Sequence, residues 1–294
     1  MTFARPVQTD PIDPLPPVPG WITRMKAQTP EDAAFLAGGM LSHLHLVMQC
    51  DSVPHPVLRD RLALRAAEAC VAFSGRPERA GELRDAVHLL RPGDLPGPAG
   101  ACYLGWRRGV ARPVSIAALH RALPEYTAKQ IAGWMDAGQG APLVRAATVL
   151  QTVLRAAPRA ETATLLLADA ALAQALGWRH LLPVLAAGLT RADLRKQDAA
   201  LQLACHRAVI ASGQQAVRMA SDLSRRAAYL RAVAPKLRAK AAGAAVEMFL
   251  TQEAVAPAAL PLPDRAARRL CDRLVDLGAV REVTGRDTFR LYGL

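Results

Sequence analysis

Along most of the chain, apolar residues recur every three or four positions, which is the spacing of helices that bury one face. A first such helix is predicted from Pro30, because Thr29 can cap it and proline suits the first helical position. A second helix is predicted over residues 56–75, where Gly75 supplies the stop. Shorter helices should follow over residues 114–154.

The later part of the chain is expected to contain longer helices. A strongly apolar helix is predicted over residues 159–177. Three more are predicted over residues 190–211, 213–233 and 235–255, the last with proline at its first position. Residues 91–100, in contrast, hold three glycines and three prolines, a composition that predicts a loop.

The C-terminal segment shows a clear division between an apolar and a charged face. Over residues 265–277, one face of the predicted helix carries Ala267, Leu270, Cys271, Leu274 and Leu277. The other face carries Arg265, Arg268, Arg269, Asp272, Arg273 and Asp276. Asp264 can cap this helix, and Gly278 provides a left-handed stop. We expect one face to pack and the other to meet solvent or a partner.

The chain then closes with a predicted β-hairpin, in which AVREV and TFRLY flank TGRD with Gly285 at the turn. A packing helix, an arginine-faced helix and a hairpin follow in the order of the later half of a winged-helix domain. In that domain one helix enters the major groove of DNA and the wing touches phosphate. The intervening APAALPLP is too rich in proline for more than one helical turn, although a complete winged helix has a short helix there.

The N-terminus differs in composition from the remainder. Six prolines lie within the first twenty residues, and since proline fixes φ and removes a hydrogen-bond donor, we expect a disordered arm over residues 1–20. A helical body should follow over residues 21–233 and a winged-helix-like unit over residues 234–294. The low aromatic fraction of 4% beside abundant alanine and leucine favours helices over sheet. The predicted fold is therefore mainly α, a large helical body with a small C-terminal winged-helix-like unit ending in a β-hairpin.

The formal net charge of +12 is strong for 294 residues and indicates an acidic partner, most commonly nucleic acid. Arginine outnumbers lysine 32 to 5, which a GC-rich coding sequence also produces, so the distribution of charge must decide. Between Asp222 and Glu247 no acidic residue interrupts a basic block. This block favours a positive face, although basic residues near a helix C-terminus also complement the helix dipole. Its members are Arg225, Arg226, Arg231, Lys236, Arg238 and Lys240.

These features together predict a non-catalytic protein that binds double-stranded DNA, in regulation or in maintenance of a mobile replicon, without a cofactor. The expected contacts are Arg265, Arg268, Arg269 and Arg273 on the terminal helix, Arg286 on the wing, and the basic block. An alternative stays open, because pairing with Asp272 and Asp276 would make the helix a self-neutralised surface. The protein would then be an interaction scaffold. A homodimer is compatible with both interpretations.

A third alternative is a small-molecule enzyme with a polar site in the body. Its residues would be Asp169, His180, Cys205 and His206. Adjacent residues on a helix point apart, so the cysteine and the histidine that follows it would need partners from elsewhere. His43 and His45 diverge by about 200° on a helix and cannot share a metal, so no metal site is expected.

The chemistry of the remaining residues indicates a cellular compartment. The five cysteines are odd in number and widely spaced, which favours reduced thiols over a disulfide framework or a zinc knuckle. The most apolar stretch is interrupted by Asp169, Gln174 and Arg179, well inside the roughly 20 apolar residues that a membrane span needs. The start of the sequence lacks the pattern of an export signal. We therefore expect a cytoplasmic location and no membrane partner.

Several longer segments carry a family likeness. They are LLLADAALAQALGW, LACHRAV, LRAVAPKLRAKAAGAAVEMFL and the closing DRAARRLCDRLVDLGAVREVTGRDTFRLYGL, with DAAFLAG, RLALRAAEA and PGPAG in support. Together they resemble a bacterial family known as domain of unknown function 1403, a resemblance that implies no substrate, cofactor or catalytic residue. The final FRLYGL is also similar to segments of bacterial proteins that look distantly related to the filamentation-type adenylyltransferases. The glycine-asparagine-glycine-arginine phosphate loop of those enzymes does not occur in this sequence.

Overall fold

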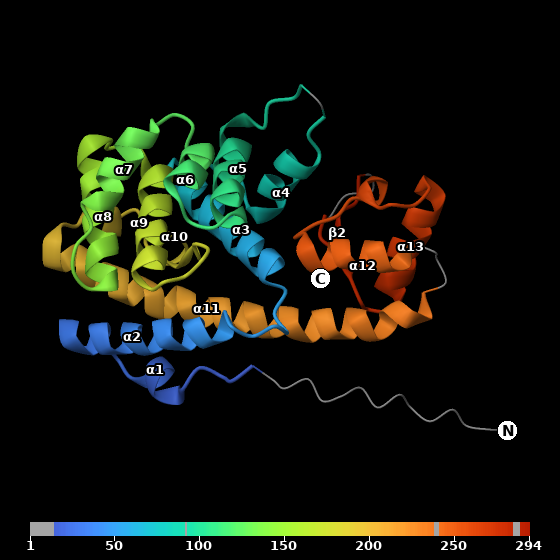
Figure 1. Ribbon diagram of the computed structural model, residues 1–294, viewed down its shortest axis with the longest axis horizontal. Coiled ribbons are helices and arrows are strands. Elements are labelled where there is room, and N and C mark those ends of the chain that lie inside the picture. The colour runs from blue at the N-terminus through green and yellow to red at the C-terminus, as the bar shows by residue number, and fades with distance from the viewer. Residues whose placement is uncertain (1–14, 92, 238–240, 285–288) are drawn as a thin grey trace.

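The computed structural model describes residues 15–91, 93–237, 241–284 and 289–294. Over these residues the protein is mainly helical, with one short antiparallel pair of strands close to the C-terminus (Figure 1). The helices of the body gather at one end of the molecule, and a smaller group of C-terminal elements lies at the other (Figure 1). The predicted mainly helical fold is confirmed at this level.

The body consists of helices joined by short loops. In chain order these helices are α1 (Gly20–Arg24), α2 (Pro30–Val47), α3 (His55–Phe73), α4 (Ala80–His88), α5 (Gly97–Ala111), α6 (Ile116–Ala122), α7 (Ala128–Asp136), α8 (Pro142–Ala156), α9 (Glu161–Ala175), α10 (Val184–Gly188) and α11 (Asp198–Val233), with the 3-10 turn η1 (Asp193–Arg195) before α11. The C-terminal elements are η2 (Ala234–Lys236), α12 (Ala242–Thr251), η3 (Pro257–Ala259), α13 (Asp264–Asp276), β1 (Arg281–Glu282) and β2 (Tyr292–Gly293).

Helix α2 begins where the local sequence predicts it. The Thr29 hydroxyl accepts a hydrogen bond from the Asp32 backbone N–H at 3.1 Å, and the Asp32 carboxylate accepts one from the Thr29 backbone N–H at 3.1 Å. This reciprocal capping satisfies donors that the first helical turn would leave without partners. Pro30 occupies the first helical position, where its missing N–H does no harm.

Helix α11 is continuous over 36 residues and runs from under the body to the C-terminal elements (Figure 1). The break predicted before Gly213 is wrong, because Gly213 lies inside this helix. A Cβ atom at Gly213 would lie 2.5 Å from Cγ of Met40 in α2. The glycine therefore allows two helices to approach closely instead of ending one.

The ends of the later helices also differ from the prediction. Helix α11 begins at Asp198 and not at residue 190, because Thr190 starts a separate turn in which its hydroxyl donates to the Asp193 carboxylate at 2.6 Å. Pro235 stands in η2, and α12 begins only at Ala242. The first error arises from turn chemistry at Thr190, whose side chain competes locally with the helix.

The predicted loop over residues 91–100 is shorter than its composition indicates. Helix α5 already begins at Gly97, which adopts a left-handed φ of +66°. Pro98 follows in the first helical turn, where proline is tolerated. The glycine- and proline-rich stretch thus contains a helix start as well as a loop.

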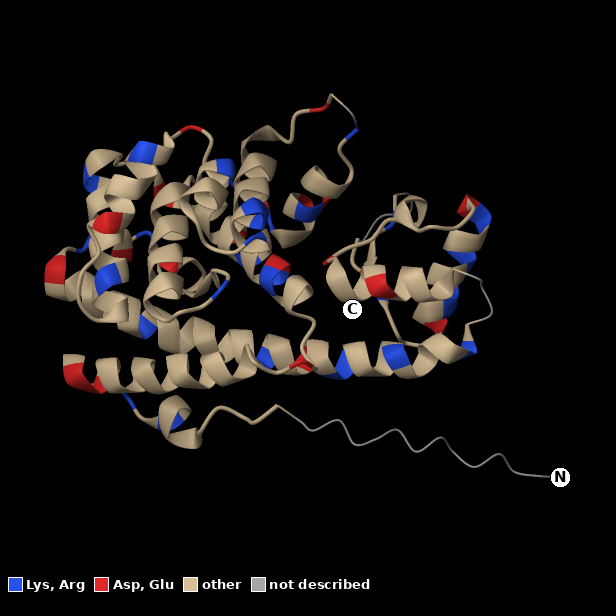
Figure 2. Cartoon of the chain, viewed as in Figure 1, with Lys and Arg blue, Asp and Glu red and all other residues tan. Residues whose placement is uncertain are grey.

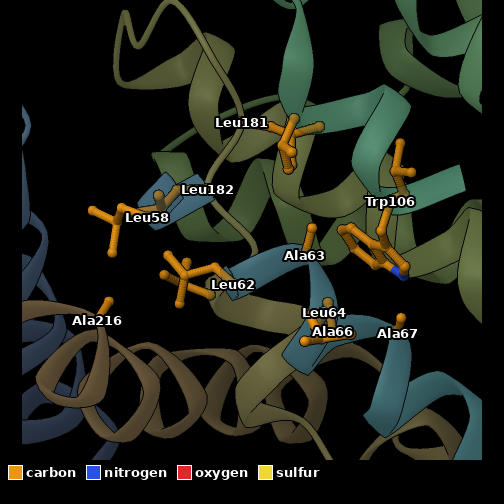
Figure 3. Close-up of a cluster of buried hydrophobic side chains, with 14 of the residues drawn as sticks. Leu58, Leu62, Ala63, Leu64, Ala66, Ala67, Trp106, Leu181, Leu182 and Ala216 are labelled. Carbon is orange, nitrogen blue, oxygen red and sulfur yellow. The ribbon is translucent and has the colours of Figure 1, made fainter. Parts of the chain in front are cut away.

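The core of the body is centred on α3, whose side chains meet those of α5, α11 and the segment before α10 (Figure 3). Trp106 of α5 is fully buried in this cluster. Its labelled members also include Leu58, Leu62, Ala63, Leu64, Ala66, Ala67, Leu181, Leu182 and Ala216. Dense packing of this kind holds α3 and α5 in fixed positions, and both helices present charged side chains outside the core.

The arm predicted over residues 1–20 falls mostly outside the described residues, which begin at residue 15. Leu15 is buried and Val18 packs against the core, while α1 already begins at Gly20. Leu15 and Val18 therefore contact the body, and the arm stays a prediction for the residues before Leu15. Proline prevents a helix there but does not prevent packing of the leucine between the prolines.

The C-terminal strands pair with a third extended segment. Arg281 lies opposite Gly293, and Glu282 lies opposite Tyr292. Val255, between α12 and η3, exchanges two backbone hydrogen bonds with Tyr292, at 2.8 and 2.9 Å. The predicted hairpin is confirmed in its pairing, whereas its turn at Gly285 lies outside the described residues.

Candidate nucleic-acid interface

Helix α13 divides into a buried and an exposed face as its sequence predicts. Leu270, Cys271 and Leu274 are buried, together with Ala267. Arg265, Arg268, Arg269 and Arg273 are all exposed on the other side. The predicted cap is wrong, since Pro263 is the N-cap and Asp264 is the first helical residue, without a side-chain capping hydrogen bond. Asp264 instead places a negative charge in the first helical turn, where it interacts favourably with the helix dipole.

Only part of the positive charge on α13 is neutralised by pairing. Arg268 forms an ion pair with Asp264 at 2.9 Å, one helical turn away. In the described part of the chain, neither Asp272 nor Asp276 forms an ion pair with an arginine of this helix. The self-neutralisation that those two carboxylates could provide is therefore not realised here, and three exposed arginines of α13 point to solvent.

The basic block on α11 is more heterogeneous. Arg225 and Arg226 both contact the Asp222 carboxylate, at 3.2 and 2.8 Å. Arg231 is exposed, as is Lys236 in η2. Arg238 and Lys240 lie outside the described residues, as does Arg286 at the predicted wing tip.

Two contacts bring the end of α11 close to the C-terminal elements. The Tyr229 hydroxyl donates to the carbonyl oxygen of Leu277, just after α13, at 2.8 Å. Burial, and then the positive charge of the neighbouring Arg226, lower the pKa of Arg281 in β1. Figure 2 shows basic residues on this end of α11 and on α13, with acidic residues also on α12 and α13.

A buried ion cluster, which the sequence analysis missed, joins the body to the C-terminal elements. Glu253 is fully buried and accepts two hydrogen bonds from Arg84 of α4, at 2.7 and 2.8 Å. Arg61 of α3 lies 3.8 Å from the same carboxylate and donates to the carbonyl oxygen of Leu294. Arg84 also donates to the carbonyl oxygen of Val283 at 3.0 Å. The signal in the sequence was a single glutamate, Glu253, between the apolar run of α12 and Val255.

The electrostatics of this cluster follow from its burial. The arginines, chiefly Arg84, hold the pKa of Glu253 below its ordinary value despite the opposing effect of burial. Burial lowers the pKa of Arg61 to about 10, which the negative charge of Glu253 partly opposes. The carboxylate is therefore ionised at neutral pH, and both guanidinium groups are charged. The cluster fixes α12 and the hairpin against α3 and α4.

The residues of the predicted enzyme site serve other roles. Asp169 of α9 is buried, and its carboxylate accepts hydrogen bonds from the backbone N–H groups of Val184, Leu185 and Ala186, at 2.8 to 3.1 Å. It therefore caps the N-terminus of α10. Burial raises the pKa of Asp169 to about 7, against the effect of these three donors. Burial also raises the pKa of Cys205 to about 12, which leaves a thiol and not a nucleophilic thiolate.

The two histidines of that set lie in different surroundings. Burial, and then the positive charges of Arg59 and Arg179 and the nearby His55, lower the pKa of His180 to about 4. His206 lines an apolar hollow between α2, α8 and α11. The structure thus does not bring the four residues together as one site. Within the described residues, no three side chains of histidine, cysteine, aspartate or glutamate converge as metal ligands.

Comparisons with known proteins identify the family and nothing narrower. No helix in the described part of the chain has both the length and the apolar character to cross a bilayer. The curated proteins contain no match to this chain. A family model described as "Protein of unknown function (DUF1403)" matches residues 7–294, nearly the whole chain. The segments that resemble this family are therefore parts of one continuous match, and the chain belongs to the DUF1403 family.

Proposed function

We propose that this protein binds double-stranded DNA without catalysis, through a C-terminal unit over residues 234–294 that is organised like a winged helix. In this proposal α13 enters the major groove and the hairpin lies against phosphate. The basic end of α11 adds contacts to the backbone. A regulatory role, or one in maintenance of a mobile replicon, would use this same surface.

The backbone pairing of Val255 with Tyr292 carries the proposal. It joins the segment between α12 and η3 to the hairpin, so that helix, bridged segment, short turn, arginine-faced helix and hairpin follow one another. A winged helix has the same order, with a short helix where this chain has η3. The turn is short because Pro257 and its neighbouring prolines limit it, as the sequence predicts.

The distribution of charge supports the same surface. Because Leu270 and Leu274 are buried, α13 must present its arginines outward. Duplex DNA carries closely spaced phosphates, and exposed arginines bind them with release of counterions. Arg269 and Arg273 have no ion-pair partner within the described residues, so they lose no existing partner when they bind phosphate or a base edge.

The test is a fluorescence-anisotropy titration of the full chain with mixed duplexes at two salt concentrations. Six phosphate contacts would give a logarithmic salt slope near about −5. The double variant Arg269→Ala and Arg273→Ala should lower affinity by at least about tenfold, with an unchanged circular dichroism spectrum. Arg155→Ala, at an exposed position on α8 far from α13 in the chain, serves as the control and should bind as the wild type does.

Two results would contradict the proposal. One is the absence of binding at low salt by the wild type. The other is equal affinity of the double variant and the control, which would make the arginine face a solvated helix surface. The interaction scaffold would then be the better interpretation of the protein.

A further inference from the structure

A hollow of about 440 Å³ lies where the body meets the C-terminal elements. Its walls come from the start of α3 and the later half of α5, and Thr251 at the end of α12 completes it. Leu104 and Val110 supply apolar surface beside the charged side chains. A concave site of this size with a few polar groups is typical of a small-molecule site and is too small for a duplex.

The charge of this hollow is strongly positive. Three arginines line it, Arg59, Arg107 and Arg108, against a single carboxylate, Asp60. That carboxylate is already engaged, since Arg107 donates to it through Nε at 3.2 Å and the Tyr103 hydroxyl donates to it at 3.4 Å. The other two arginines therefore have no acceptor within the described residues that line the hollow.

Arg59 is the most informative of the three. Its Nε atom is buried, and no acceptor among the described residues contacts it. A buried donor without an acceptor is unfavourable, by an amount comparable to a lost hydrogen bond to a charged group. Asp60, the next residue, is held by Arg107 and does not supply that acceptor.

Further basic side chains lie around Arg59 outside the hollow. Arg179 and His180 come from the loop between α9 and α10, and His55 comes from the first residue of α3. Burial, and then the charge of Arg179, lower the pKa of Arg59. Two guanidinium groups that repel each other, one of them with a buried donor that lacks an acceptor, are stabilised when an anion binds beside them.

We propose that this hollow binds a small organic anion, whose carboxylate or phosphate group is held by Arg59 and Arg108 while its body rests on Leu104 and Val110. Guanidinium groups suit this role, because their planar donors match the oxygens of both kinds of group. The site is independent of the DNA surface on α13. Because Thr251 belongs to α12, a bound anion touches both the body and the C-terminal elements.

The experiment uses the full chain in a chloride buffer, with pyrophosphate and citrate as the two probes at matched ionic strength. Thermal unfolding should show a saturable rise in Tm with at least one probe, and titration calorimetry should give one site per chain. The stronger probe identifies phosphate or carboxylate as the preferred group. Arg59→Met and Arg108→Met should each weaken that probe by at least about tenfold.

The stability of the variants without a probe separates binding from folding. Arg59→Met removes a guanidinium whose buried Nε has no acceptor among the described residues, so the Tm of the variant should equal or exceed that of the wild type. Arg108 is exposed, which keeps the test valid if the first variant does not fold. Arg121→Met, at an exposed position on α6 outside the hollow, is the matched control and should bind the probe as the wild type does.

Three results would overturn the proposal. The first is that neither probe raises the Tm. The second is that the Arg59 and Arg108 variants bind the probe as tightly as the control does. The third is that Arg59→Met weakens the binding of a DNA duplex and leaves the binding of the probe unchanged. The last result would mean that the arginines of the hollow bind nucleic acid. Variants of Arg269 and Arg273 should keep full binding of the small probe, so failure of the DNA proposal and failure of this one are distinguishable.

Discussion

The Glu253 carboxylate accepts two hydrogen bonds from Arg84, although the two residues are 169 positions apart in the chain. The glutamate is fully buried, and the arginine side chain is 14% exposed. The pair therefore joins α4 to the segment after α12 in a place where water does not compete. Its removal tests how firmly the C-terminal elements are held.

We expect Arg84→Ala to lower the free energy of unfolding by about 3 to 5 kcal/mol, because it leaves the buried Glu253 with Arg61 as its remaining cation, at 3.8 Å. Urea denaturation measures this. The control is Arg79→Ala, whose ion pair with Glu68 spans 3.8 Å at the surface and should change stability by less than about 1 kcal/mol. Equal effects of the two substitutions would show that the buried pair does not hold the C-terminal elements.

Asp60 should make stability depend on pH in an unusual direction for a carboxylate. Burial raises its pKa to about 6, which the neighbouring Arg107 only partly opposes. Its contribution to stability is therefore complete below about pH 4 and declines as pH rises through about 6, by up to roughly 3 kcal/mol. Asp60→Asn should remove this decline.

The measurement is urea denaturation of wild type and Asp60→Asn at several pH values between about 4 and 7, in chloride buffer. The free energy of unfolding of the variant minus that of the wild type should increase as pH rises. A difference that stays constant over this range would mean that Asp60 titrates at the same pH in the folded and unfolded states.

Gly213→Ala should destabilise the protein by about 1 to 3 kcal/mol, since its Cβ would collide with Met40 across the α2 and α11 contact. Gly133→Ala is the matched control within α7, because no atom lies within 4 Å of a Cβ there. That substitution should stabilise the protein by roughly 0.5 to 1 kcal/mol through helix propensity. Thermal unfolding of both variants measures the contrast, and a stabilising Gly213→Ala would refute the close approach.

Asp169→Ala should lower stability by roughly 3 kcal/mol or more, because three buried backbone N–H groups lose their acceptor. Asp169→Asn retains one oxygen acceptor and should cost less. Hydrogen exchange of residues 184–186 provides a local readout, with faster exchange in the alanine variant. Unchanged exchange in that variant would mean that the carboxylate does not cap α10.

The sequence by itself determined those elements whose signals are local. Thr29 and Asp32 cap α2 within one turn, and the buried face of α13 follows from the spacing of Leu270, Cys271 and Leu274. Hydrogen bonds and side-chain positions within one helix depend on neighbours three or four residues away, so the pattern of residues contains them. The pairing of the terminal strands was accessible because a short segment with a glycine separates the two apolar runs.

The tertiary structure decided what depends on distant neighbours. From the sequence alone, Gly213 predicts a helix end, whereas in the structure it allows Met40 to approach. Asp169 was a candidate for a polar enzyme site, whereas in the structure its carboxylate caps α10. The hollow likewise assembles Arg59 and Arg108 from two helices with Thr251 from a third. Such contacts form only when the packing of the core brings helices together, and that packing depends on side chains along the whole chain, which no local pattern contains.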